Sequence, residues 1–203
     1  MKLIWPVGLV LVSSLLSPAA ASPLAGGELI QDNHFQNGFV LWEPKPGRHV
    51  RYGDLQGRNA GAAPAWGLSQ WSSRFPLEAS LGAAGLPGVL VWSNAAKAVT
   101  MGAARTEQAD VTLTANSRVE YGPRARAAGD PWVHLLAEQE FAPPARLSEL
   151  GAARFHVEAR LLYSRNLHQG DYSAGTHAAQ FQIFFTVQNR NRQSPGYGDL
   201  LWF

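Results

Sequence analysis

Polar side chains that could bind a ligand recur at every second position along three segments in the second half of the sequence. Each segment alternates them with apolar residues, which is the pattern of a β-strand with one buried and one solvent-facing side. The three segments are 132–141, 155–163 and 178–189. Their polar positions give the predicted ligand-binding residues His134, Glu138, Glu140, Glu158, Arg160, Gln180, Gln182 and Gln188.

These side chains share one surface if the three strands are neighbours in one antiparallel sheet. Residues two apart on a strand lie about 6.5–7 Å apart, a spacing similar to that of hydroxyl groups along a sugar chain. Carboxylates, amides and a guanidinium at this spacing can bind several hydroxyls at once. The pattern therefore predicts a cleft for a polysaccharide or oligosaccharide, and the alternative is an ordinary solvated sheet face.

The same face contains groups for two kinds of catalysis. Glu138 and Glu140 could act as the carboxylate pair of a glycoside hydrolase. They lie on one strand, however, and their expected separation falls between those of retaining and inverting enzymes. A polysaccharide lyase would need a base such as His134, His156 or His177. An amide or a guanidinium, for example Gln182 or Arg160, would neutralise a uronate. Since no linear motif supports either arrangement, we assign no catalytic residue.

Two tryptophans, Trp66 and Trp71, flank the short segment 67–70. Exposed indole rings stack on sugars and offer an N–H donor, so both residues are added to the predicted ligand-binding set. The alternative is that both rings close one end of the hydrophobic core, where large aromatic side chains usually lie.

The histidines do not predict a metal site. The six of them form neither an HExxH motif nor a pair at zinc spacing, and we expect no metal and no cofactor. His168, Asp171 and His177 lie in or near one loop and form the alternative metal-binding set.

A second polar loop, 190–199, contains Arg190 and Arg192. It is long for a hairpin connection, and long loops are often functional. The two guanidinium groups could bind sulfate or uronate groups, or could simply keep the loop solvated.

The N-terminal residues predict export. Residues 1–21 contain a single charge at Lys2, an apolar stretch over 3–16 and small residues at 19–21, the pattern of a secretory signal peptide. The apolar stretch is shorter than the about 20 residues that a membrane-spanning helix requires, so it is predicted to be a signal peptide rather than a membrane anchor. After removal of the signal peptide, we expect no membrane-spanning segment. The predicted location is therefore secreted or periplasmic.

The overall composition excludes several classes of function. The chain has 17 basic and 15 acidic residues and no basic block, which argues against nucleic acid as a partner. It has no cysteine, which excludes disulfides, thiolate metal sites and thiol catalysis.

Residues 22–203 are expected to form a single domain. Charged residues make up only 16% of the chain, whereas 20 glycines and 13 prolines are present, which is typical of short strands joined by turns. Further strands are expected near 28–31, 50–52, 89–92 and 111–121. The predicted fold is an all-β antiparallel sandwich. The last apolar residues, 200–203, begin a strand at which the chain stops, so a C-terminal truncation stays open.

The run LIQDNHFQNGFVLWEP, residues 29–44, is similar to the opening of galactose-binding-like jelly-roll modules. In those modules a first strand leads through a turn rich in Asn and Gly to a buried Trp, which corresponds here to Trp42. The sequence has Asn33, His34 and Phe35 where the modules have a small Gly-Asp or Gly-Asn pair. The resemblance implies a jelly-roll fold and non-catalytic polysaccharide binding, and a structural or protein-binding sandwich is the other alternative.

Overall fold

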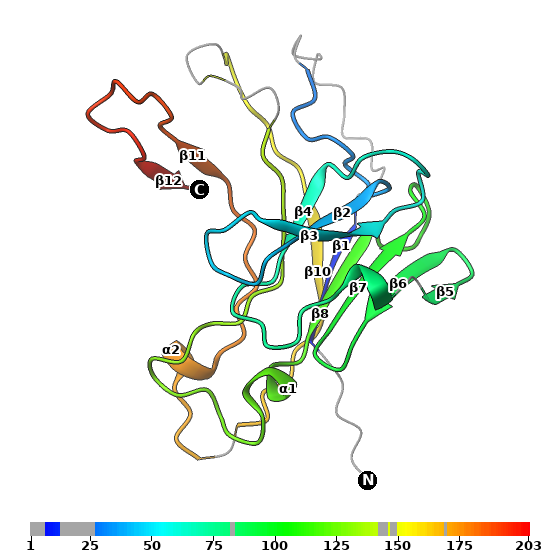
Figure 1. Ribbon diagram of the computed structural model, residues 1–203, viewed down its shortest axis with the longest axis vertical. Coiled ribbons are helices and arrows are strands. Elements are labelled where there is room, and N and C mark those ends of the chain that lie inside the picture. Colours follow the sequence, from blue (N-terminus) through cyan, green and yellow to red (C-terminus); the bar gives the residue numbers. More distant parts are fainter. Residues whose placement is uncertain (1–6, 13–26, 82–83, 142–145, 147–149, 169) are drawn as a thin grey trace.

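The computed structural model describes residues 7–12, 27–81, 84–141, 146, 150–168 and 170–203. Within these ranges the chain consists mainly of short β-strands, with two short α-helices and one 3-10 turn (Figure 1). The prediction that the protein is built mainly from β-strands is therefore confirmed. The strands form three sheets of very different size.

The largest sheet has six strands, and every neighbouring pair in it is antiparallel. Its strands, in spatial order, are β10 (Glu158–Tyr163), β1 (Val7–Val12), β8 (Val111–Ala115), β7 (Lys97–Gly102), β6 (Val89–Ser93) and β5 (Ala84–Leu86).

The second sheet has four strands and carries the candidate site. Its strands, in spatial order, are β3 (Arg51–Gln56), β2 (Gly38–Trp42), β4 (Trp66–Ser69) and β9 (Leu136–Glu138). The β2–β4 pair is parallel, whereas β3 and β9 pair antiparallel with their neighbours.

The remaining elements are small. Strands β11 (Thr186–Gln188) and β12 (Leu200–Trp202) form a two-stranded hairpin, which stands apart from the larger sheets in Figure 1. The helical elements are η1 (Ala79–Leu81), α1 (Ser117–Tyr121) and α2 (Ala174–His177).

The hydrophobic core is shared by the two larger sheets. In the four-stranded sheet, Phe39 and Leu41 of β2 and Leu68 of β4 are fully buried on the same side. These side chains join one cluster with residues of β6, β7 and β8. The cluster contains Phe35, Phe39, Leu41, Leu55, Leu68, Leu77, Trp92, Val99, Met101, Val111 and Leu113.

The three strands predicted in the second half of the chain do not lie in one sheet, so that prediction is wrong. They become β9, β10 and β11, each in a different sheet. Residues 178–185, expected to begin the last strand, are not in a strand. Leu161 and Ile183, which alternate with the polar positions of these segments and were therefore expected in the core, are 48% and 47% exposed. The core is already filled by residues of β2 to β8, and alternation alone does not reveal which apolar face is packed.

The predicted strand 111–121 is likewise shorter than expected. It ends at Ala115, and residues 117–121 form helix α1 instead. Asn116 lies between the end of β8 and the start of α1. Its backbone N–H donates to the carbonyl of Ala96, and its carbonyl accepts from the N–H groups of Val119 and Glu120. This turn gives the first residues of α1 a partner for their backbone groups.

Most of the predicted signal peptide, residues 1–6 and 13–21, lies outside the described residues. Its central part, Val7–Val12, forms β1 and pairs with β8 on one side and β10 on the other. Removal of the leader therefore stays a prediction. Separately, no helix in the described part of the chain has the length and apolarity needed to cross a membrane.

Replacing Gly38 with alanine is expected to lower the free energy of unfolding by about 2 kcal/mol. Gly38 has a φ of +87°, and an added Cβ would lie 2.0 Å from the carbonyl oxygen of Leu55, so backbone would have to move. Urea denaturation measures the effect. Gly47→Ala is the matched control, because Gly47 also has a positive φ but no atom within 4 Å of the added Cβ. Equal losses in both variants would show that strain of φ alone matters at Gly38.

Candidate functional site

The side of the four-stranded sheet that faces away from the core carries the candidate site. Residues directly opposite each other in an antiparallel pair share one face. Gly67 lies opposite Glu138, and Ser69 lies opposite Leu136. The alternating residues Phe39, Leu41 and Leu68 are fully buried on the other side. We call the outward set the polar face, and it comprises Trp42, His49, Ser69, Trp71, His134 and Glu138.

Glu138 lies at one end of the polar face. Its Oε1 accepts hydrogen bonds from Ser69 Oγ at 2.6 Å and from His49 Nε2 at 2.9 Å. The His49 ring meets the Trp42 ring edge-on, with centroids 5.4 Å apart. Among the described residues, Oε2 of Glu138 has no hydrogen-bond partner, so this oxygen can accept from a ligand hydroxyl.

The order of these three polar groups excludes a serine-protease type of activation. In a catalytic triad the histidine lies between the serine and the carboxylate and removes the serine proton. Here the carboxylate of Glu138 lies between Ser69 and His49, and both donate to it. Ser69 is also fully buried. The arrangement therefore holds Glu138 in place and does not create a nucleophile.

Trp71 and His134 form the other end of the polar face. The His134 backbone N–H donates to the Trp71 carbonyl at 3.0 Å, which continues the β4–β9 pairing, and the two rings meet edge-to-face at 5.4 Å. Trp71 Nε1 and His134 Nδ1 are both buried and have no hydrogen-bond partner among the described residues. An indole N–H only donates, whereas the unprotonated nitrogen of a neutral imidazole accepts. One hydroxyl group carries the acceptor and the donor that these two atoms need, but both atoms are shielded from solvent, so the two rings must part before a ligand reaches them.

Gly67 allows Trp42 to lie close over the sheet. A Cβ at position 67 would lie 2.1 Å from Trp42 Nε1, so the indole occupies the space that any larger residue would fill. Trp42 of β2 and Trp71, two residues after β4, thus lie on the same side of the sheet. The Trp42 ring lies near Glu138, through His49 and Gly67, and the Trp71 ring lies beside His134.

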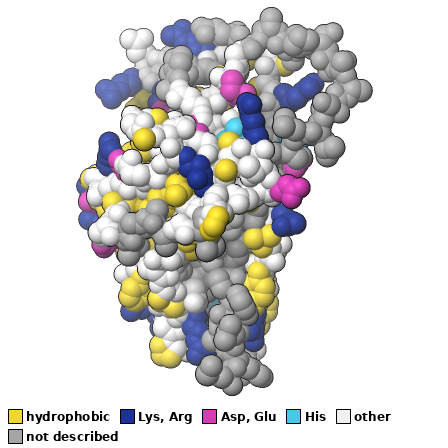
Figure 2. Space-filling view, turned by 90° about the vertical axis from the view of Figure 1, so that its right-hand side faces the viewer, with side chains coloured by type: hydrophobic (Ala, Val, Ile, Leu, Met, Phe, Trp, Pro, Cys, Tyr) yellow, Lys and Arg dark blue, Asp and Glu magenta, His cyan; other side chains and the backbone are white. Residues whose placement is uncertain are grey.

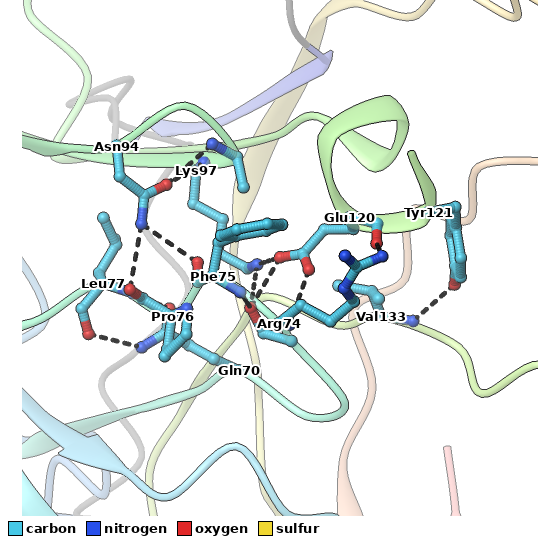
Figure 3. Close-up of polar contacts among 12 residues, drawn as sticks. Gln70, Arg74, Phe75, Pro76, Leu77, Asn94, Lys97, Glu120, Tyr121 and Val133 are labelled. Atoms are coloured by element: carbon cyan, nitrogen blue, oxygen red, sulfur yellow. Dashed lines mark hydrogen bonds and ion pairs between the residues drawn. The ribbon is translucent and has the colours of Figure 1, made fainter. Parts of the chain in front are cut away.

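Helix α1 fixes the loop that follows Trp71 (Figure 3). The Glu120 carboxylate accepts hydrogen bonds from Ser73 Oγ at 2.7 Å, from the Arg74 backbone N–H at 2.7 Å and from Lys97 Nζ. The side chains of Lys97 and Glu120 are 0% and 1% exposed. Burial alone would raise the pKa of Glu120, but the bonds from Lys97, Ser73 and Arg74 together lower it. Burial lowers the pKa of Lys97.

The same helix also fixes the segment that leads to His134. Tyr121 Oη accepts from the Val133 backbone N–H at 3.1 Å and donates to the Pro131 carbonyl at 2.8 Å. On the other side, Gln70 Oε1 accepts from the Leu77 N–H at 2.7 Å and closes the 70–77 loop. Trp71 and His134 are therefore held by buried polar contacts that lie outside the polar face.

The structure brings together three of the predicted ligand-binding residues, Trp71, His134 and Glu138. Trp66 instead packs against the core: its ring lies 4.4 Å from that of Phe35, and its Nε1 donates to the Asp32 carbonyl at 2.9 Å. Trp66 therefore follows the alternative of a core role.

The other predicted residues lie elsewhere, since their strands separate. Glu140 pairs with Arg190, which brings it next to the β11–β12 connection that Gln188 precedes. Glu158 and Arg160 lie on β10, the edge strand of the six-stranded sheet. The last two, Gln180 and Gln182, lie in the exposed segment before β11.

Sequence analysis missed Trp42, His49 and Ser69 as members of the polar face. For Trp42 and Ser69 a signal existed, because both alternate with the buried apolar residues of β2 and β4. His49 precedes β3 in a loop, where no periodicity could indicate its contact with Glu138.

The alternative metal-binding set is not assembled. The His168 and His177 rings stack at 4.0 Å, but both nitrogens of His177 are engaged. Its Nδ1 accepts from the Ser173 N–H at 2.9 Å, and its Nε2 lies 3.0 Å from the Arg126 carbonyl, to which it donates. No group of three potential metal ligands occurs in the part of the chain that the structure describes.

Neither a protein-family model, nor a curated protein, nor a solved structure matches this chain. The similarity of residues 29–44 to galactose-binding-like modules therefore stays a prediction. Any functional conclusion rests on the geometry of the polar face.

The stability of the protein is expected to fall as the pH drops below about 6.5, with His134 responsible for part of the loss. Burial lowers the pKa of His134, and a hydrogen bond with the Trp132 backbone only partly opposes this. Between the folded and unfolded pKa values the unfolded chain binds more protons, so stability rises with pH across that window. Urea midpoints at about pH 5.5 and about pH 7.5 should differ less in His134→Gln than in the wild type. An unchanged difference would contradict the role of His134.

Proposed function

We propose that the protein is a secreted or periplasmic, non-catalytic carbohydrate-binding protein that binds polysaccharide on the polar face. We further propose that its two larger sheets form a sandwich of jelly-roll type, since they share one core. The single observation that carries the functional proposal is the adjacent pair Trp71 and His134, each with a buried polar atom that lacks a partner among the described residues.

A sugar hydroxyl matches this pair chemically. A buried polar group without a partner costs about 1–3 kcal/mol. Once the two rings part, a hydroxyl that accepts from Trp71 Nε1–H and donates to His134 Nδ1 removes this cost at both atoms. The rings of Trp42 and Trp71 supply apolar surface for the faces of sugar rings. Glu138 Oε2 is available to accept from a second hydroxyl.

The charge distribution supports a neutral or weakly acidic ligand over nucleic acid. Lys and Arg side chains are scattered among uncharged side chains on the face shown in Figure 2. On the polar face itself the charged group is the Glu138 carboxylate, which repels phosphate. Binding of a phosphate backbone depends instead on clustered Lys and Arg.

The second candidate function is a polysaccharide lyase that uses the same face. One observation favours it: because burial lowers the pKa of His134, its imidazole is neutral at pH 7 and can accept a proton. Against it, the groups expected to neutralise a uronate, Arg160 and Gln182, lie on β10 and before β11 rather than on the four-stranded sheet. We therefore place binding first.

Affinity electrophoresis tests the proposal directly. Migration of the protein should be retarded in gels that contain a polysaccharide, tested with dextran as the neutral polymer and polygalacturonate as the acidic one. Retardation in neither gel would count against carbohydrate binding. Prolonged incubation followed by assays for new reducing ends and for unsaturated products separates binding from cleavage, and the appearance of either product would replace this proposal with the enzymatic one.

A further inference from the structure

The connection between β11 and β12 forms a surface hollow with two arginines in its wall. The hollow has a volume of about 360 Å³ and is lined by Gln188, Asn189, Arg190, Arg192 and Tyr197. Every one of these side chains carries a polar group, and two carry a guanidinium. Arginine presents a planar fork of N–H donors that fits a carboxylate or a sulfate through two parallel hydrogen bonds.

The asparagines of this connection hold its shape. Asn189 Nδ2 donates to Ser194 Oγ at 2.9 Å, and Asn189 Oδ1 accepts from the Asn191 N–H at 3.0 Å. Asn191 Oδ1 then accepts from the Gln193 N–H at 3.0 Å. The side chains of Asn189 and Asn191 therefore stabilise the loop. The side chains of Arg190 and Arg192 take no part in these hydrogen bonds. A site fixed in this way loses little freedom when a ligand binds.

The two arginines differ in their partners. Arg190 pairs with Glu140, but both side chains are exposed, and an exposed ion pair contributes at most about 1 kcal/mol. A ligand anion can therefore displace Glu140 at small cost. Arg192 has no hydrogen bond or ion pair among the described residues. The other acidic residue of the connection, Asp199, lies with its carboxylate beside Gly196.

The Arg190–Glu140 pair also connects this hollow to the polar face. Glu140 lies two residues after Glu138, a separation that spans at most about 7 Å of chain. The contact places Arg190 near the end of β9, where the polar face ends.

We propose that the hollow of Arg190 and Arg192 binds a carboxylate or sulfate group of an acidic polysaccharide whose hydroxyls occupy the polar face. This inference rests on the proposed function and specifies its ligand class as an acidic polymer. A planar carboxylate and a tetrahedral sulfate can each present two acceptor oxygens to one guanidinium fork, so the choice between them is left to the experiment.

The test compares affinities for dextran, polygalacturonate and dextran sulfate in Arg192→Ala, Arg192→Lys and the wild type. Arg192→Ala should weaken binding of one acidic polymer about tenfold, because a charge-assisted hydrogen bond is lost, and should leave dextran binding unchanged. The affinity of Arg192→Lys for that acidic polymer should lie between those of the wild type and Arg192→Ala, since lysine keeps the charge but lacks the planar fork of N–H donors. The acidic polymer with the larger loss identifies the group that is bound.

Arg105→Ala is the matched control, because Arg105 is also an exposed arginine but lies in the β7–β8 connection of the other sheet. An equal loss in this control would show a general charge effect and overturn the inference, as would an unchanged ratio of acidic to neutral affinity in Arg192→Ala.

The outcomes also separate this inference from the proposed function. A wild type that binds dextran but neither acidic polymer overturns the inference alone. Acidic binding that depends on Arg192 but is unaffected by Trp71→Ala supports the arginine hollow and overturns the polar face. Binding of none of the three polymers overturns both.

Discussion

Replacing Glu120 with alanine is expected to lower the free energy of unfolding by about 3–5 kcal/mol. The change leaves the ammonium group of Lys97 buried without its anion, and it also removes the acceptor for Ser73 Oγ and the Arg74 N–H. Urea denaturation at neutral pH measures the loss. A decrease below about 1 kcal/mol would contradict the view that this pair anchors the loop.

The double variant Lys97→Met with Glu120→Leu is the control for burial. Replacing both charges of a buried pair by apolar residues of similar volume is often neutral or stabilising, because two desolvation penalties disappear together. We therefore expect the double variant to be far more stable than Glu120→Ala alone. If the two variants are equally unstable, the packing of these side chains rather than their charge is responsible.

The acid dependence of the Glu120 cluster has a definite sign. The pKa of Glu120 is lowered in the folded protein, so its stabilising contribution is complete above its unfolded pKa of about 4.5 and is lost as the pH falls through the lower folded value. The loss of stability at His134 begins at a higher pH, from about 6.5 downward.

The sequence predicted the strand character of the protein and the direction of several side chains. In the segment 132–141, alternation placed His134 and Glu138 opposite Leu135 and Ala137, and the structure packs Leu135 and Ala137 against the core. Trp71 was predicted from its residue type alone. The pairing of β4 with β9 joins residues that are about 70 positions apart, such as Ser69 and Glu138. No local pattern encodes such a partner, so the composition of the polar face could not be predicted.

Alternation failed where the apolar side of a strand does not contact the core. Phe155, Leu161 and Ile183 have the spacing of buried residues, yet they are at least one-third exposed. Phe155 instead stacks on Phe185, with ring centroids 3.6 Å apart, in a separate cluster near the hairpin. Apolar residues at every second position indicate that one face of a strand favours burial. Whether that face is buried depends on whether another part of the fold packs against it.

Replacing Trp71 with alanine is expected to weaken binding of dextran about thirtyfold, which corresponds to about 2 kcal/mol. The substitution removes both the ring that packs against a sugar and the Nε1–H that lacks a partner among the described residues. It also removes the indole that is proposed to share one bound hydroxyl with His134 Nδ1. Affinity electrophoresis over a range of dextran concentrations measures the change.

Two further substitutions separate the ring from its hydrogen bond. Trp71→Phe keeps an aromatic face but loses the N–H donor, so its affinity should lie between those of Trp71→Ala and the wild type. Trp202→Ala is the matched control, because Trp202 is 60% exposed on β12 and does not belong to the polar face. If Trp202→Ala weakens dextran binding as strongly as Trp71→Ala does, the sugar binds at the C-terminal hairpin. The unpaired atoms of Trp71 and His134 would then be explained by packing alone.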